Sequence, residues 1–319
     1  MNQESAAPRV KIEIIDEASE GQRVDNFLLK TMKGVPKTRI YRCIRKGEVR
    51  VNGKRVKANS RLDMGDKVRI PPIRMSEAEH AVAGEGIRNR LEESVLFENE
   101  ALLVINKPTG MAVHGGSGVS LGVIETLRQM RPESRYLELV HRLDKETSGC
   151  LMVAKKPKYL RSLQALLQNK KELGKHYVCV VQGRWPKRKQ AVKLPLTKHL
   201  LASGERVSRV QADGKACLTE YDVLEQDSQL SLLAVRPITG RTHQIRVHCA
   251  ASGYPILGDE KYGAKEGDAK LSDKVWRLML HAERLDIPAL HGLPKVVVEA
   301  PRDDHFRRFE KLIKFSNNK

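Results

Sequence analysis

Residues 141–149 read HRLDKETSG and place one aspartate, Asp144, among three basic side chains, those of His141, Arg142 and Lys145. Two structural interpretations of Asp144 are open. It could pair with Arg142, or it could cap a turn, because Asp followed by Thr-Ser-Gly suits a loop. A short motif of this kind matches by chance in many proteins. The rest of the chain therefore has to decide what Asp144 does.

The composition indicates a globular and strongly basic protein. The chain has 319 residues, of which 40% are hydrophobic, and this is enough for one large domain and a small one. Lys and Arg number 58 against 39 Asp and Glu, so the net charge is +19 and the expected partner is a polyanion such as nucleic acid. The start, MNQESAAPRVKIEI, is polar, and no apolar run of about 18 residues follows it. We therefore expect a cytoplasmic protein with no membrane partner, and a monomer by default.

The cysteines argue against a metal site. Cys43, Cys150, Cys179, Cys217 and Cys249 lie far apart and form no Cys-x-x-Cys pair, so neither zinc nor a disulfide framework is indicated. We expect each to be a small core residue in a reducing compartment. The sequence also lacks a phosphate-binding loop of the Walker type, which excludes a nucleotide-binding hydrolase. No metal and no cofactor are expected.

Residues 21–73 predict a small domain of two helices and a hairpin. Apolar residues at helical spacing fill 21–46, with a break at residues 34–36, and Gly47 follows as a stop signal. Asn52-Gly53 between two alternating runs predicts a type I′ hairpin. Basic side chains lie on the second helix and at the hairpin: Arg39, Arg42, Arg45, Lys46, Lys54 and Arg55. A charged helix face is often only solvated, but with the hairpin these cations form a surface suited to RNA phosphates.

The remaining segments have different compositions. Residues 1–20 are expected to form an N-terminal tail. Residues 74–90, RMSEAEHAVAGEGIRNR, have no apolar period and mix Gly, Ala and charge, so they are expected to be a linker. In residues 91–319, strand-like runs alternate with helical segments. This pattern favours an α+β domain with a mixed or antiparallel sheet rather than a doubly wound fold.

A second dense group of polar residues occurs at 236–253, RPITGRTHQIRVHCAASG. Thr242 can cap a helix that Gly253 ends, and this would place His243 and Arg246 on one helical face. Arg246 would then be a rigidly held guanidinium able to reach a carboxylate from elsewhere in the fold. The alternative is a basic helix end that faces only water.

The order of several motifs resembles that of the RluA-type pseudouridine synthases, enzymes that isomerise uridine in structured RNA. HRLDKETSG, GKHYVCVV and GRTHQIRVH occur in the order and approximate spacing of that family. VINKPTGMAVHGG precedes them, and GYPILGDEKYG and MLHAERLDI follow them. The basic module in front resembles the S4 RNA-binding domain. Several long motifs in one order, from about residue 20 to about residue 310, are far more specific than a single motif.

The resemblance implies a reaction and a set of site residues. Asp144 corresponds to the family's catalytic nucleophile, and Arg246 to its buried salt-bridge arginine. Tyr177 corresponds to the tyrosine that stacks on the target base and is implicated in the proton steps. Arg142 corresponds to the arginine that enters the space left by the extruded base. The physics agrees, because a carboxylate is a weak nucleophile that must be ionised and aimed, and an adjacent cation does both.

The resemblance also implies the substrate. An S4-like module is more typical of members that act on ribosomal RNA, so we expect the enzyme to isomerise specific uridines in large-subunit (23S) ribosomal RNA or its precursor. The family uses no metal or cofactor. The alternative is a noncatalytic RNA-binding ribosome-assembly factor. That alternative predicts loss of the reactive residues, yet Asp144, Tyr177 and Arg246 are all present.

Overall fold

The structure is a computed structural model, and it describes residues 9–32, 34–73, 81–115, 121–169, 173–201, 205–263, 275–290 and 292–316. Residues 1–8 of the predicted tail and residues 74–80 of the predicted linker lie outside this described part. The chain divides into two compact units, residues 1–81 and 82–319, and each is described by itself. In the described part, no helix is both long enough and apolar enough to cross a membrane.

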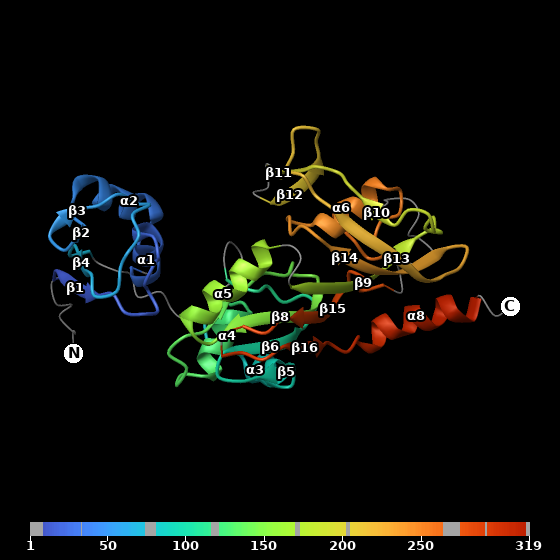
Figure 1. Ribbon diagram of the computed structural model, residues 1–319, viewed down its shortest axis with the longest axis horizontal. Coiled ribbons are helices and arrows are strands. Elements are labelled where there is room, and N and C mark those ends of the chain that lie inside the picture. The colour runs from blue at the N-terminus through green and yellow to red at the C-terminus, as the bar shows by residue number, and fades with distance from the viewer. Residues whose placement is uncertain are drawn as a thin grey trace, which may run out of the picture. The chain divides into compact units, whose positions relative to one another are not determined.

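The first unit contains the two helices and the hairpin that the sequence predicts (blue in Figure 1). Asn52 (φ 49°) and Gly53 (φ 78°) both have the positive φ of a type I′ turn. Gly47, at φ 72°, ends the second helix in the left-handed conformation. The sheet has the order β1-β4-β2-β3. The bounds are α1 Val24–Thr31, α2 Lys37–Lys46, β1 Lys11–Ile14, β2 Arg50–Val51, β3 Lys54–Arg55 and β4 Lys67–Ile70.

The strand β1 lies inside the segment that was predicted as a tail, residues 1–20. It pairs antiparallel with β4 and is an edge strand of the sheet. Ile12 and Ile14 are mostly exposed, so backbone hydrogen bonds rather than buried side chains hold β1 in place. Because the strand buries so little, its apolar pattern does not distinguish it from a tail.

A buried carboxylate joins the two helices of the first unit. Asp25, in the first turn of α1, accepts hydrogen bonds from Arg23 Nη2 at 2.6 Å and from Tyr41 Oη of α2 at 2.8 Å. Its side chain is almost fully buried. The hydrogen bond from Arg23 holds the pKa of Asp25 below its usual range, although burial opposes this effect.

Asp25→Asn is expected to destabilise the first unit by about 1–3 kcal/mol, because Arg23 and Tyr41 lose a charged acceptor. In the wild-type chain the contribution of Asp25 is present at neutral pH. Since its folded pKa lies below the unfolded one, the contribution is lost as the pH falls through the folded value. Amide hydrogen exchange in α1 and α2 measures both effects, with the exposed Glu17→Gln as a control. Equal exchange in the two variants would contradict this role of Asp25.

The second unit is built on one mixed sheet. Within the described residues its strands follow the order β10-β13-β14-β9-β15-β8-β6-β5, with β16 beside β15 and β7 beside β8. The neighbours are antiparallel except β8 and β15, which are parallel. The predicted α+β class with a mixed sheet is confirmed. The bounds are β5 Val95–Glu98, β6 Leu102–Lys107, β7 Glu138–Leu139, β8 Ser148–Ala154, β9 Gly174–Gln182, β10 Ala191–Val192, β13 Thr219–Gln226, β14 Leu230–Pro237, β15 Leu280–Ile287 and β16 Val296–Glu299.

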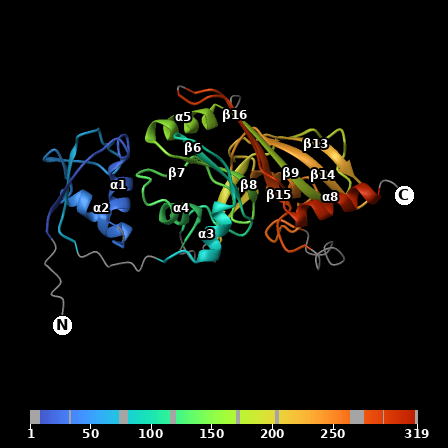
Figure 2. The ribbon, with the colours of Figure 1, turned by 90° about the horizontal axis from the view of Figure 1, so that it is seen from below.

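Helices cover both faces of the half of the sheet that contains β6 and β8 (Figure 2). Helix α5 (Pro157–Gln168) packs on one face, and α3 (Glu85–Glu92) and α4 (Val123–Met130) pack on the other. Residues 85–90 of helix α3 were assigned to the linker 74–90, but the helix belongs to the second unit. Leu91 is its buried side chain, so the segment has too little apolar periodicity to predict a helix.

The other half of the sheet carries α6 (Gln244–Ala251) and α8 (Asp304–Ser316), which both pack on β13 and β14. A separate hairpin of β11 (Leu196–Leu200) and β12 (Arg206–Val210) contacts α6 through β12 (Figure 1). Neither strand of this hairpin was predicted from the sequence. The five cysteines are free and buried, as expected of core residues.

Gly149, the last residue of HRLDKETSG, permits the parallel contact between β8 and β15. Its φ is 109°, and a Cβ placed on it would lie 2.2 Å from the carbonyl oxygen of Ala282 in β15. Glycine is the residue that tolerates both this φ and this approach. The motif therefore fixes the central strand pair as well as the position of Asp144, which lies in the loop before β8.

Candidate active site

The loop between β7 and β8 presents Asp144 and is anchored to the end of β6. Lys107, the last residue of β6, is fully buried and donates hydrogen bonds to three backbone carbonyl oxygens at 2.8–2.9 Å, one of which belongs to Lys145. Thr109 Oγ1 donates to Glu146 O at 2.7 Å. The two residues that follow Asp144 are therefore tied to the end of β6 and to the chain directly after it.

Lys107 is a buried cation whose hydrogen bonds are all used for structure. Burial lowers its pKa to about 7, against the opposing charges of Glu146 and Asp144. Its three carbonyl acceptors match the three hydrogens of an ammonium group, whereas a neutral amine would turn its lone pair toward one of them. The geometry thus favours the charged form, which holds the loop of Asp144 in place.

His141 is not the cation that its place in the motif suggests. Burial and the nearby charge of Lys175 lower its pKa to about 4. Its Nε2 accepts a hydrogen bond from the Met152 N–H at 3.1 Å, which requires an unprotonated nitrogen. His141 therefore anchors the loop to β8 as a neutral ring and adds no positive charge beside Asp144.

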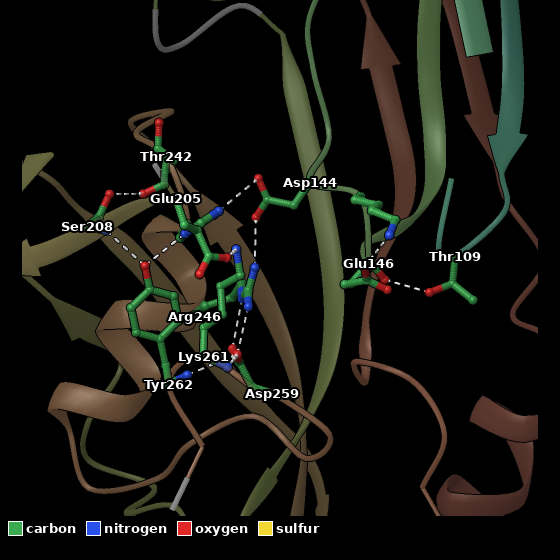
Figure 3. Close-up of polar contacts among 12 residues, drawn as sticks. Thr109, Asp144, Glu146, Glu205, Ser208, Thr242, Arg246, Asp259, Lys261 and Tyr262 are labelled. Atoms are coloured by element: carbon green, nitrogen blue, oxygen red, sulfur yellow. Dashed lines mark hydrogen bonds and ion pairs between the residues drawn. The ribbon is translucent and has the colours of Figure 1, made fainter. Parts of the chain in front are cut away.

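The carboxylate of Asp144 faces Arg246 of α6, as Figure 3 shows. Arg246 Nη1 lies 3.5 Å from Asp144 Oδ2, while its Nε and Nη2 donate to Asp259 at 2.8 and 2.7 Å. The side chain of Arg246 is 3% exposed and that of Asp259 is 0% exposed, so this bidentate pair lies in the interior. Burial opposes the charge of Arg246, but the hydrogen bonds and charge of Asp259 outweigh it and raise the pKa.

His243 is the second group that faces Asp144. Its Nε2 lies 3.7 Å from Asp144 Oδ1, and its Nδ1 lies 2.8 Å from Tyr262 Oη. Tyr262 Oη also accepts the backbone N–H of Ser208 at 2.9 Å. Arg246 Cζ lies 5.2 Å from the centre of the Tyr262 ring. Tyr262 therefore supports both residues that face the carboxylate.

The start of α6 differs from the sequence prediction. Helix α6 begins at Gln244, and its N-cap is His243 in the left-handed conformation rather than Thr242. The Thr242 carbonyl oxygen accepts a hydrogen bond from Ser208 Oγ of β12 at 2.8 Å, and Gln244 Oε1 accepts the Arg241 N–H at 3.1 Å. Contacts with β12 and with the helix itself thus take the place of the expected Thr cap. They turn His243 toward Asp144.

Tyr177 lies on β9, between two parts of the core. It packs against the hydrophobic cluster that contains Leu143 and against the one that contains Ile245. Burial raises the pKa of its hydroxyl, and the charge of Asp144 adds to this effect. Tyr177 is thus a neutral phenol in the neighbourhood of Asp144.

The residues predicted to bind RNA are mostly exposed. Arg142 is exposed two residues before Asp144, and no residue of the described part forms an ion pair with it. In the first unit Arg55 Nη2 donates to Lys46 O at 3.2 Å, which brings hairpin and helix cations together. Arg39 is half-buried. The other predicted cations of this unit are exposed: Arg42, Arg45, Lys46, Lys54 and Arg55.

Three residues of the site were missed by the sequence analysis: Ser208, Asp259 and Tyr262. Asp259 and Tyr262 lie within GYPILGDEKYG, one of the motifs that carried the family resemblance, so this motif was the signal that could have found them. Ser208 contacts Tyr262 through its backbone N–H, and because almost every residue has this group, the sequence gives no signal of the contact.

A cavity of about 980 Å³ is lined by charged residues of β13 to β16 and by His176 and Tyr177 of β9. Asp144 is not among its lining residues. Its arginines pair with acidic neighbours: Arg236 with Glu220, Arg284 with Glu299 and Arg302 with Glu283. Because these charges are already compensated within the protein, the surroundings of Asp144 remain the candidate site. Among the residues that the structure describes, no group of three metal-ligating side chains could hold a metal ion.

Two family profiles match the chain. The family described as RNA pseudouridylate synthase matches residues 101–251, and the S4 domain family matches residues 22–68. These matches confirm the family and the front module predicted from the sequence.

Close relatives match almost the whole chain. A protein of Escherichia coli (strain K12) named Ribosomal large subunit pseudouridine synthase C is 47% identical, with 94% of this chain and 96% of that protein covered. A protein of the same name from Pasteurella multocida (strain Pm70) is 51% identical, with 94% of this chain and 92% of that protein covered. Among solved structures, Human RNA Pseudouridylate Synthase Domain Containing 4 has a TM-score of 0.59 and 26% identity, with 72% of this chain and 96% of that chain covered.

Asp259→Asn is expected to lower both stability and activity. The change leaves Arg246 buried with a neutral partner, and removing one member of a buried pair costs about 3–5 kcal/mol. Asp286→Asn is the matched control, since Asp286 pairs with Arg284 at a more exposed site, and it should cost less than about 1 kcal/mol. Thermal unfolding and turnover on RNA are measured for both variants. Equal losses of stability and turnover in the two variants would contradict the expectation that the buried pair contributes more than the exposed pair.

Proposed function

This chain belongs to the family of RNA pseudouridylate synthases, and we propose that it isomerises specific uridines of large-subunit (23S) ribosomal RNA with Asp144 as its nucleophile. The printed name of relatives that are 47–51% identical over 94% of the chain supports this substrate. The observation that carries the role of Asp144 is its place opposite Arg246, a buried guanidinium that Asp259 holds rigidly.

The reaction moves the uracil from one attachment to another. The bond between uracil N1 and ribose C1′ breaks, the base turns within the site, and a bond forms between C5 and C1′. The proton on C5 leaves and N1 gains a proton, so no atom is gained or lost overall. A base in folded RNA is stacked and must first be turned out, which costs roughly a few kcal/mol that contacts elsewhere must offset.

Asp144 meets the geometric needs of a carboxylate nucleophile, which has to be fixed and aimed. Its loop is anchored by Lys107 through the carbonyl of Lys145. Arg246 Nη1, 3.5 Å away, supplies the cation that orients the carboxylate. The side chain of Asp144 is 19% exposed, which leaves it accessible to an atom of the substrate.

Tyr177 and Arg142 are proposed to handle the target base. Because the pKa of Tyr177 is raised, its phenol is neutral and can stack on a uracil or take part in a proton transfer without repelling the RNA. Arg142 is exposed at the start of the Asp144 loop. It is proposed to enter the space that the extruded base leaves in the RNA.

The S4 domain is proposed to hold the RNA backbone. Its exposed cations on α2 and the hairpin suit phosphate contacts, which fix the register of the RNA but carry little base information. The choice of uridine then falls to the surroundings of Asp144 and to the shape of the RNA. With ribosomal RNA or a large-subunit precursor as the partner, the cytoplasm is the proposed location and a monomer the proposed state.

Asp144→Asn is expected to abolish turnover while RNA binding survives, because the amide keeps the shape of the carboxylate but is no nucleophile. Tritium release from RNA labelled at uridine C5 measures turnover, with ribosomal RNA from cells that lack the protein as substrate. The exposed Asp213→Asn is the control and should turn over as the wild type does. Turnover by Asp144→Asn would remove Asp144 as the nucleophile. Binding without release by the wild type would favour the noncatalytic ribosome-assembly factor.

Replacing Arg42, Arg45 and Lys54 by Ala is expected to weaken RNA binding and to flatten its dependence on salt. Each lost phosphate contact should reduce the slope of log K against log salt by about 0.7–0.9. The matched control removes three exposed cations of α8, Arg307, Arg308 and Lys311. Filter binding over a range of salt concentrations measures the slopes. The same slope in the S4 variant as in the wild type would contradict the proposed role of this surface.

A further inference from the structure

His243 has a positive φ, which is a strained backbone conformation for a residue other than glycine. Among the described residues, only Asn52 and His243 are non-glycine residues with positive φ. Asn52 sits in a type I′ turn that needs this conformation. His243, at φ 55°, precedes a helix that a residue in the extended conformation could begin equally well. Strain of this kind persists only where the surroundings hold it, and it is often found at functional sites.

The hydrogen bonds around His243 favour one position for the hydrogen on its ring. The backbone N–H of Ser208 can only donate, so Tyr262 Oη is the acceptor of that bond at 2.9 Å. The hydroxyl has one hydrogen of its own, and His243 Nδ1 lies 2.8 Å from it. If the hydroxyl hydrogen is used within the protein, Tyr262 donates to Nδ1, and Nδ1 is then unprotonated. In a neutral ring the hydrogen is then on Nε2.

The neutral form of His243 is the one that its surroundings favour. Burial lowers its pKa, and the charges of Arg246 and Lys261 add to this against the opposing charges of Asp144 and Asp259. A protonated ring would turn a second N–H toward Tyr262 Oη, and the phenol hydrogen would then need a new acceptor. No contact in the described part of the chain supplies one.

The protonated Nε2 lies 3.7 Å from Asp144 Oδ1, on the side of the carboxylate that Arg246 does not face. This distance is too long for a hydrogen bond, but contacts of this kind commonly tighten when the substrate binds. Arg246 Nη1 faces the other oxygen, Oδ2, at 3.5 Å. The two donors thus lie opposite the two oxygens of one carboxylate.

We propose that His243 is a positioning residue which, as the neutral Nε2–H tautomer, donates a hydrogen bond to Asp144 Oδ1 and so sets the rotation of the carboxylate. Tyr262 and the backbone N–H of Ser208 in β12 favour this tautomer. The proposal rests on the proposed role of Asp144 as the nucleophile. His243 thereby adds a neutral hydrogen-bond donor to the charged donor of Arg246. Through Ser208 and Tyr262, the orientation of the Asp144 carboxylate then depends on the hairpin of β11 and β12.

The hairpin is connected to the site at several points. Besides its N–H, Ser208 donates through Oγ to the carbonyl of Thr242, directly before His243. Glu205, just before β12, forms an ion pair with Lys261, next to Tyr262. A shift of β12 would therefore move His243 and Tyr262 together.

The tautomer is measured directly by nitrogen NMR of the full chain with labelled histidine. The His243 signals are assigned by their absence in His243→Gln. We expect a protonated Nε2 and an unprotonated Nδ1 at neutral pH. Tyr262→Phe removes the hydroxyl hydrogen, so the preference for this tautomer should weaken. A protonated Nδ1 in the wild type, as the other tautomer or as an imidazolium, would overturn the proposal. This readout does not depend on turnover, so it stands apart from the proposed function.

Two substitutions separate hydrogen bonding from backbone strain. The amide nitrogen of Gln can occupy the place of Nε2, whereas that of Asn reaches only the place of Nδ1. Asn, however, is the residue that better tolerates the left-handed conformation. If donation to Asp144 matters, His243→Gln should keep kcat within about threefold and His243→Asn should lose about tenfold or more, with KM unchanged in both. Higher kcat in Asn than in Gln, or a loss confined to KM, would overturn the proposal.

Two further measurements complete the design. His176→Gln makes the same change at a histidine of β9 that pairs with Asp286 of β15 and not with Asp144, and it should leave kcat unchanged. A tenfold loss in this control would show that the effect is not specific to His243. Asp144→Asn is assayed in parallel. Turnover by that variant would remove the proposed nucleophile, whereas normal kcat in His243→Asn with an inactive Asp144→Asn would remove only the role of His243.

Discussion

The buried ion pair between Arg246 and Asp259 is the interaction on which the catalytic region depends. Removing both charges from water is costly, and geometry of this quality is what repays the cost. Asp259 accepts two hydrogen bonds from Arg246 and two more from the backbone N–H groups of Lys261 and Tyr262. The pair therefore joins α6 to the segment that carries Tyr262. It also commits two of the guanidinium donors, which leaves Nη1 for Asp144.

A second constraint acts on the nucleophile from the opposite half of the sheet. The Asp144 loop is held by the ammonium of Lys107, by neutral His141 and by the close parallel approach of β8 and β15 at Gly149. None of these groups touches the carboxylate. The backbone of Asp144 is thus fixed by one half of the sheet, and its side chain is oriented by residues from the other half. The continuous sheet keeps the two halves in register.

Much of this arrangement could be predicted from the sequence. The type I′ turn at Asn52-Gly53 and the mixed sheet follow from turn chemistry and strand patterns, whereas the proximity of Asp144 to Arg246 was implied by the family resemblance. The strand β1 and the helix α3 were missed because they bury few side chains. The cap of α6 was misplaced because Ser208, far away in sequence, decides it. Backbone donors and long-range acceptors leave no periodic signal, so the partners of the site residues were the least predictable part.

The charges near the nucleophile also explain why the enzyme needs a strongly basic remainder. Among Asp144, Asp259, Arg246 and His243, the two carboxylates face one guanidinium, and a neutral His243 adds no charge. This group of four side chains is negative on balance, and such a group does not attract a polyanion by itself. The chain as a whole carries +19, and exposed cations such as Arg142 and those of the S4 domain lie outside the buried network. Affinity for RNA and alignment of the carboxylate are therefore assigned to different residues. Because of this division, the buried network can be optimised for geometry without weakening the hold on the RNA.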